Sequence, residues 1–385
     1  MRIASVWLLA LLGAACAACS ARSEVRKELG PPGDAHQIGR GDGSPSSVDL
    51  VIVYQSDTPR QATDLAFNPL RPNELWVLLR EFVDGPPCTH VERHGCAELE
   101  GSVAIVRDPG GSQPVAELKK DENAWHFMRT PTGIAFGDNG NFSTCSEHRT
   151  GNYDDDTPDY NGPTLWSSDP AIFTITPPGG NGSHIDMLHE SPYAMGIAHE
   201  HANVYWVYNG KLGALDRYDF MQPHQPGAED HSDGQLLRYA EGSLKRQPGV
   251  PGHLVVEPER GRVYVADTGN RRVVALEPAG GAPVQDLAVL EPMQLAKSIG
   301  GARLIEVVAP GVLEAPSGVA IADNVLFVTD NGTSKIHAFD LDGNPLRTLD
   351  TGLPAGTLAG IAIGPDDRAY LADIAAAKVR RIDVH

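Results

Sequence analysis

A five-residue phrase recurs six times along this chain, and it constrains the fold more than any other feature. Each copy has two small or polar residues followed by an apolar triplet, and the later copies lie about 40 to 65 residues apart. The copies occupy residues 63–67, 132–136, 195–199, 252–256, 317–321 and 359–363. A unit of this length cannot bury its own apolar face, so the units must stack or close into a ring. Six copies with strand-like composition predict an all-β fold, a six-bladed β-propeller.

The three C-terminal repeats show the expected structure of one blade. In the fourth repeat, an inner strand near 253–256 precedes a strand at 262–267 and a third strand at 271–276. The fifth and sixth repeats follow the same order within 325–339 and 369–382. Short β-rich runs separated by Gly, Asn, Asp and Pro are typical of strands joined by tight turns.

These blades resemble NHL-type repeats, in which a Gly-Ile/Val-Ala strand leads to a Tyr-Val-Ala-Asp strand and then to an Asn-x-Arg-Val/Ile strand. The resemblance is closest in the fourth repeat, where residues 264–267 are Tyr-Val-Ala-Asp, and it covers nearly all of residues 60–385. It implies a propeller with a solvent channel on the axis. It does not imply one activity, because such propellers include ligand-binding modules, lyases and sugar-lactone hydrolases.

Residues 1–19 have the composition of a secretory signal, with one positive charge, a short apolar stretch and a small-residue exit. Cys16 directly follows small residues and is the predicted lipidation site of a bacterial lipoprotein, with Cys19 or simple cleavage as alternatives. Residues 20–47 are rich in Ser, Gly, Pro and Arg and are predicted to form a flexible tether. We therefore expect an exported protein, in the bacterial cell envelope or secreted, that contacts the membrane only through a lipid anchor.

Residues 48–385 are predicted to form one propeller domain. The run 48–54 has strand composition, whereas the sixth repeat ends after three strands, so this run is expected to supply the fourth strand and close the ring. The alternative is that it caps the first blade. Two long insertions, about 81–101 and 146–168, fall between second and third strands and so build up one face, here called the upper face.

Four histidines are expected to reach the upper mouth of the channel, where they are candidate ligands of zinc or another transition metal. They are His126, His148, His189 and His253. His253 stands where the second, third, fifth and sixth repeats have glycine. Glu147 and Glu190 are the candidate catalytic bases. This pattern is similar to the peptidyl-amidating lyase branch of NHL propellers, where histidines near inner strands hold a catalytic zinc, although only His253 occupies a directly comparable place. The alternative is a set of loop histidines bonded to the backbone.

A second histidine set is expected on the opposite, lower face. His199 is the last residue of the third repeat phrase and His201 lies two residues beyond it, and His224 and His231 lie in a long turn farther along the same blade. A metal staple that joins these four residues is one interpretation, and an ordinary polar turn is the other.

An acidic loop is a weak calcium candidate. Asp154, Asp156 and Asp159 offer the oxygen ligands that Ca²⁺ prefers, but their spacing is not that of an EF-hand loop. A solvated acidic loop is the alternative. Trp125, Tyr153, Tyr160 and Trp166 could line a sugar or aromatic site nearby, or simply pack the insertion.

The cysteines beyond the signal region suggest one disulfide. Cys88 and Cys96 bracket a short polar loop, and export makes a bond between them plausible, with a zinc knot that adds His90 and His94 as the rival. Cys145 is then left single.

Charge and motif content limit the classes of binding partner that we expect. The net charge of −19 argues against nucleic-acid binding, which needs a basic face. No phosphate loop, dinucleotide fingerprint or Gly-x-Ser-x-Gly elbow is present. The first hypothesis is a monomeric module that binds a small molecule, glycan or envelope protein at the axial face. The second is a metal-dependent lyase or hydrolase with a His-ligated ion at the channel mouth.

Overall fold

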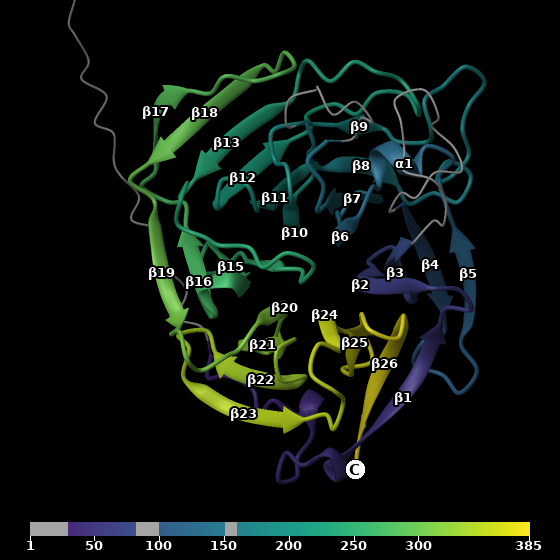
Figure 1. Ribbon diagram of the computed structural model, residues 1–385, viewed down its shortest axis with the longest axis vertical. Helices are drawn as coiled ribbons and strands as arrows, with labels where there is room; N and C mark the ends of the chain where they lie inside the picture. The colour runs from purple at the N-terminus through teal and green to yellow at the C-terminus, as the bar shows by residue number, and fades with distance from the viewer. Residues whose placement is uncertain (1–29, 82–99, 151–159) are drawn as a thin grey trace, which may run out of the picture.

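The computed structural model describes residues 30–81, 100–150 and 160–385, and these residues form six small, mostly antiparallel sheets arranged around a central axis (Figure 1). Cys16, Cys88 and Cys96, and the acidic residues Asp154, Asp156 and Asp159, lie outside the described residues. In the described part, no helix is long and apolar enough to span a bilayer. The predicted all-β, six-bladed propeller is confirmed.

Each blade has four strands that run from the axis outward. Blade 1 contains β2 (Arg60–Asn68), β3 (Arg71–Glu81), β4 (Gly101–Arg107) and β5 (Val115–Lys119). Blade 2 contains β6 (Pro131–Phe136), β7 (Asn141–Ser146), β8 (Thr164–Ser167) and β9 (Asp186–Met187). Blade 3 contains β10 (Ala194–His201), β11 (Val204–Asn209), β12 (Ala214–Asp219) and β13 (Gln235–Tyr239).

The remaining three blades follow the same order. Blade 4 contains β14 (Leu254–Glu257), β15 (Arg262–Asp267), β16 (Arg272–Glu277) and β19 (Arg303–Val308). Blade 5 contains β20 (Pro316–Ala322), β21 (Val325–Asp330), β22 (Lys335–Asp340) and β23 (Pro345–Asp350). Blade 6 contains β24 (Leu358–Ile363), β25 (Ala369–Asp373), β26 (Lys378–Val384) and, as its outer strand, β1 (Val48–Gln55).

The N-terminal strand closes the ring as predicted. β1 pairs antiparallel with β26, from Val48 opposite Val384 to Gln55 opposite Lys378. The first and last segments of the domain therefore share one sheet, and closure removes the free edge that blade 6 would otherwise expose.

A hairpin that the sequence pattern did not reveal enlarges blade 3. Between β16 and β19 the chain forms β17 (Ala282–Asp286) and β18 (Leu295–Gly300). β18 pairs in parallel with β13, so the insertion from blade 4 makes blade 3 a six-stranded sheet (Figure 1).

The segment before β1 differs from the predicted tether. Ala35 and Ile38 are buried in the core between blades 5 and 6, and the Gln37 amide donates to Asp367 at 2.7 Å. Two apolar side chains and a buried amide are enough to dock this segment, although its Gly, Ser and Pro content resembles a linker. The tether prediction is therefore wrong for residues 30–47, whereas residues 20–29 lie outside the described part.

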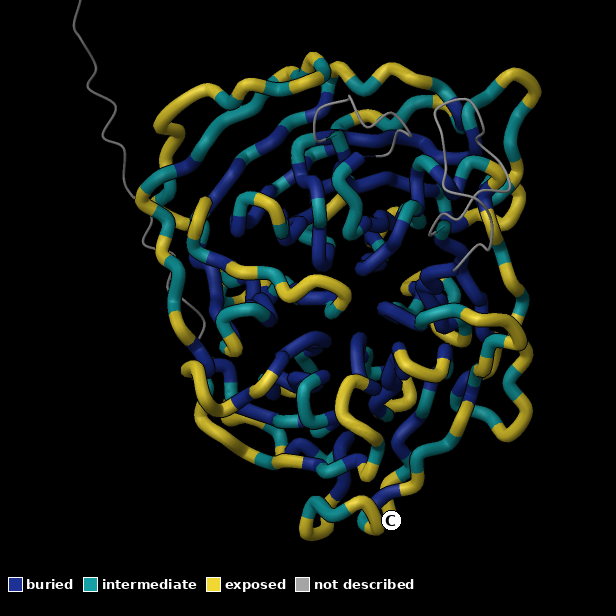
Figure 2. Tube along the Cα trace, in the orientation of Figure 1, coloured by how far each residue is buried: buried dark blue, intermediate teal, exposed yellow. Residues whose placement is uncertain are grey.

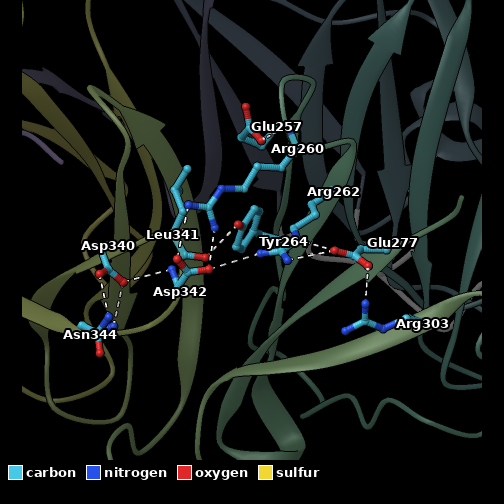
Figure 3. Close-up of polar contacts among 10 residues, drawn as sticks. All are labelled: Glu257, Arg260, Arg262, Tyr264, Glu277, Arg303, Asp340, Leu341, Asp342 and Asn344. Atoms are coloured by element: carbon cyan, nitrogen blue, oxygen red, sulfur yellow. Dashed lines mark hydrogen bonds and ion pairs between the residues drawn. The ribbon is translucent and has the colours of Figure 1, made fainter. Parts of the chain in front are cut away.

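Six apolar clusters hold the ring together, one between each pair of neighbouring blades. The rim and loops are exposed while the strand interiors are buried (Figure 2). Hydrogen bonds between blades add to these cores. Between blades 4 and 5, the Tyr264 hydroxyl donates to the Leu341 carbonyl at 2.9 Å, and Arg260 donates to Asp342 at 2.5 Å (Figure 3). Neighbouring blades are thus fixed by both apolar packing and hydrogen bonds.

Candidate ligand site on the propeller axis

The second position of each repeat phrase points toward the axis. In five of the six inner strands, the pairing register with the second strand shifts at this position, and such a bulge re-aims the residue away from the sheet. Four of the six positions are glycine. A Cβ on Gly196 would lie 2.5 Å from the Gly252 carbonyl oxygen, and one on Gly318 would lie 2.4 Å from that of Ala359. Glycine therefore lets neighbouring inner strands approach each other at the axis.

Asp64 and His253 replace glycine at the other two positions. They belong to blades 1 and 4, which are opposite in the ring, yet His253 Nδ1 lies 3.4 Å from Asp64 Oδ1. A Cβ on Gly360 of blade 6 would lie 2.6 Å from Asp64 Oδ1 and 3.3 Å from His253 Cε1. A contact between opposite blades crosses the axis, so this pair occupies the centre of the channel.

Hydrogen bonds fix both side chains of the pair. His253 Nε2 lies 2.9 Å from the Thr132 carbonyl oxygen, which can only accept, so Nε2 carries a proton. Asp64 accepts the backbone N–H groups of Leu65 and Ile134, each at 2.9 Å. Burial raises the pKa of Asp64, although the neighbouring His253 and these donors oppose the increase. The space between Oδ1 and Nδ1 is therefore a sheltered place for one proton or for one donor group of a ligand.

A cavity of about 210 Å³ extends from this pair toward the C-terminal ends of the inner strands. All six blades line it, each through the first apolar position of its repeat phrase. These residues are Leu65, Ile134, Ile197, Leu254, Val319 and Ile361. The axis thus holds an open cavity with a mixed lining of aliphatic side chains and polar groups, and Asp64 and His253 lie at one end of it.

A larger groove of about 510 Å³ lies between blades 3 and 4. Its charged side chains are already paired: Arg217 contacts Glu200 at 2.7 Å, and Arg262 contacts Glu277 at 2.8 Å. Because these charges neutralise each other, whereas the axial cavity holds a buried pair that all six blades surround, we regard the smaller axial cavity as the better ligand site.

The predicted bases on the upper face have structural partners. Glu147 accepts hydrogen bonds from Arg246 at 2.7 Å and from Gly249 N at 3.0 Å, and it lies 3.5 Å from Arg80. Arg80 is the penultimate residue of β3 and Glu147 directly follows β7, so the ends of these two strands lie close together. Glu190 accepts the Leu290 N–H at 2.6 Å, and burial raises its pKa. Both carboxylates connect loops of different blades.

The four predicted metal ligands are spread over three places. His253 lies on the axis, whereas His148 Nδ1 contacts the Thr150 carbonyl at 2.7 Å near the blade 2 insertion. His189 stacks on Tyr160 at 3.7 Å and approaches Glu291 at 3.0 Å. His126 lies on α1 (Ala124–Phe127), the short helix between blades 1 and 2. Within the described residues, no three of these four histidines form a group with metal-ligand spacing.

A different histidine group forms instead. His224 and His231 come together with His184, which the sequence reasoning missed, and without His199 or His201. Burial, with two neighbouring imidazoles, lowers the pKa of His184 to about 3. His189 lies beside this group, with its ring centroid 6.5 Å from that of His231. The available signal was topological: both loops join third to fourth strands, and they belong to neighbouring blades.

Cys145 is a free, buried thiol among the described residues. Burial raises its pKa to about 12, so it is not an activated nucleophile.

Comparisons with known proteins agree with the fold. No family model matches the chain. Human NHL repeat-containing protein 2 is 28% identical over 121 residues, which cover 31% of this chain and 14% of the human protein. The chain thus spans about one seventh of the length of that relative.

Solved structures resemble nearly the whole chain at low identity. An auxiliary nutrient binding protein from Bacteroides ovatus has a TM-score of 0.52 and 11% identity, with 88% of this chain and 76% of that chain covered. A streptogramin B lyase has a TM-score of 0.47 and 11% identity, with coverages of 89% and 99%. The likeness to the nutrient binding protein agrees with the six closed blades, so the chain is a six-bladed β-propeller, and its repeats resemble those of NHL proteins.

Proposed function

We propose that this chain is an exported ligand-binding propeller that holds a small molecule with an apolar body and a cationic or donor head in its axial cavity. The observation that carries the proposal is the buried Asp64–His253 pair at one end of a cavity that six aliphatic side chains, one from each blade, help to line. The signal-like residues 1–19 support export, and Cys16 is the proposed site of a lipid anchor.

Size and charge narrow the ligand class. A cavity of about 150 Å³ holds benzene, so the axial cavity of about 210 Å³ is large enough for a molecule the size of benzylamine. The ammonium group would donate to Asp64 Oδ1 and His253 Nδ1. The net charge of −19 favours the approach of cations.

The cavity position also suggests how a ligand enters. The lining residues include Phe136, His199 and Val256, which lie near the ends of their inner strands. Entry from the lower face passes these residues before it reaches the polar pair. The insertions on the upper face then remain available for a partner in the envelope.

A titration with benzylamine and benzyl alcohol tests this proposal. For eight heavy atoms at about −0.7 kcal/mol each, the expected Kd for benzylamine is on the order of 0.1 mM. We expect the full chain to bind the amine more tightly than the alcohol, and Asp64→Asn to remove that preference. Asp286→Asn is a matched control, because it removes one exposed acidic charge on the hairpin of β17 and β18, outside the cavity lining.

Ligand-observed NMR would follow both compounds. Equal binding by wild type and Asp64→Asn, or weak binding of every probe beyond about 10 mM, would contradict the proposed axial site.

A further inference from the structure

Three histidines from two neighbouring blades converge at the boundary between blades 2 and 3. His184 lies in the connection from β8 to β9, whereas His224 and His231 lie in the connection from β12 to β13. Each ring offers one nitrogen, and the three atoms lie within 4.8 Å of one another. Across the described ranges, this is the one group of three or more His, Cys, Asp or Glu side chains with that spacing.

The same nitrogen of each ring is already anchored. Nδ1 of His184 lies 2.9 Å from the Asn181 carbonyl oxygen, and Nδ1 of His224 lies 2.7 Å from that of Gln225. Nδ1 of His231 lies 3.0 Å from a carboxylate oxygen of Asp186. Carbonyl oxygens only accept hydrogen bonds, so Nδ1 of His184 and Nδ1 of His224 donate, and their Nε2 atoms keep their lone pairs. Nδ1 of His231 also lies 3.3 Å from the Met187 backbone nitrogen, and we assign it as the donor to Asp186 because the carboxylate is the closer and stronger partner. Metal-binding histidines are held in this way by carbonyls and carboxylates.

Two polar atoms of this group are buried and unpaired. Nε2 of His224 is buried without a hydrogen-bond partner, and Oδ2 of Asp186 is likewise buried and unpaired. His184 is 1% exposed, and its ring stacks on Phe127 with centroids 3.9 Å apart. The ring planes are therefore fixed before any ligand arrives.

Buried hydrogen-bond acceptors without donors destabilise the folded protein unless a ligand or ion binds to them. Buried acceptors without donors lose the hydrogen bonds that water would give them, and each costs about 1–3 kcal/mol. A cation at the centre would satisfy all three lone pairs at once.

We propose that His184, His224 and His231 bind one divalent transition-metal ion through their Nε2 atoms. Three imidazoles suit Zn²⁺ in tetrahedral coordination, with a water as the fourth ligand. Cu²⁺, Ni²⁺ and Co²⁺ share the preference for imidazole, whereas Ca²⁺ and Mg²⁺ favour oxygen ligands. The ion links the β8–β9 connection of blade 2 to the β12–β13 connection of blade 3. This site is away from the axis and does not depend on the proposed axial ligand.

Metal analysis of the full chain, purified without a histidine tag, tests the site. After loading with zinc and dialysis against a weak chelator, we expect about one equivalent of zinc in the wild type. His184→Gln and His231→Gln should each retain less than about 0.2 equivalent. His337→Gln on β22 is the matched control, because this histidine is outside the group and should leave the zinc content unchanged.

Two further measurements test the site without counting the zinc ions bound per chain. Asp186→Asn keeps all three ligands but weakens the anchor of His231, and it should lower zinc affinity by about 10- to 100-fold in a competition titration. Zinc at about 100 times its Kd should raise the Tm of the wild type by roughly 4 °C, and EDTA should reverse the shift.

A wild type that retains less than about 0.2 equivalent of zinc, copper, nickel or cobalt after loading would overturn the proposal. Equal zinc content and affinity in wild type, His184→Gln and His231→Gln would also overturn it. A circular dichroism spectrum of each variant separates loss of the ion from loss of the fold.

Discussion

A buried ion pair in blade 3 should be among the most sensitive points of the fold. Asp216 is fully buried, and it accepts two hydrogen bonds from Arg238, at 2.7 and 2.9 Å. Arg238 also donates to the Glu190 carbonyl at 2.7 Å, and so holds the connection between blades 2 and 3. Glu190 has a φ of 92°, a backbone conformation that a non-glycine residue rarely adopts. The pair therefore maintains a strained turn as well as neutralising a buried charge.

Arg238→Met tests this role at nearly constant side-chain length. The substitution leaves the Asp216 carboxylate buried with hydrogen bonds from Ser191 and Asn209 but with no cation. Breaking a buried pair on one side costs about 3–5 kcal/mol. At about 2.1 cal/mol/K per residue, the domain of residues 48–385 has an unfolding entropy of about 0.7 kcal/mol/K, so Tm should fall by roughly 4–7 °C.

Differential scanning calorimetry at pH 7 would measure the change. The double variant Asp216→Asn/Arg238→Met removes both charges, and we expect it to recover about half of the lost stability or more. A fall in Tm below about 1 °C for Arg238→Met, or no recovery in the double variant, would refute this account of the pair.

Three further predictions concern other parts of the ring. Gly318→Ala places a Cβ 2.4 Å from the Ala359 carbonyl oxygen and should cost about 1–3 kcal/mol in chemical denaturation, whereas no loss would show that the inner strands separate easily. The Cys145 thiol, whose pKa burial raises to about 12, should not react with a thiol reagent at pH 8 until the protein is unfolded; rapid labelling of the native chain would contradict its burial. His36 has its pKa raised by a hydrogen bond to Asp367, so this contact stabilises the docked N-terminal segment below the ordinary histidine pKa and is lost as pH rises through the higher folded value. Hydrogen exchange at Gly39, corrected for intrinsic rates, should accelerate over that range in wild type but not in His36→Asn.

The architecture could be predicted from the sequence because the patterns that indicate it lie within single strands and repeats. Each apolar triplet belongs to one inner strand, and the strand at 48–54 was expected to close the ring because the sixth repeat lacked its fourth strand. The hairpin formed by β17 and β18 was missed, because its exposed strand has no apolar period and its pairing with β13 crosses between blades. Docking of residues 30–47 was missed because it depends on Ala35 and Ile38 meeting a seam that only the closed ring creates.

The sites were harder to predict because they join distant parts of the chain. His253 was noticed as a departure from glycine, but Asp64 occupies the same repeat position and meets it only because blades 1 and 4 face each other. His184 was missed because its partners lie in a different blade, about 40 residues farther along. His189 was placed at the channel mouth, whereas it lies beside the blade 2–3 boundary near His231.

The most direct test of the axial site is a crystal structure of the full chain grown with benzylamine. The account predicts the aromatic ring between Leu65 and Leu254, with the nitrogen within hydrogen-bond distance of Asp64 and His253. An empty axis, with benzylamine bound only elsewhere, would contradict the claim that this propeller holds its ligand in the axial cavity.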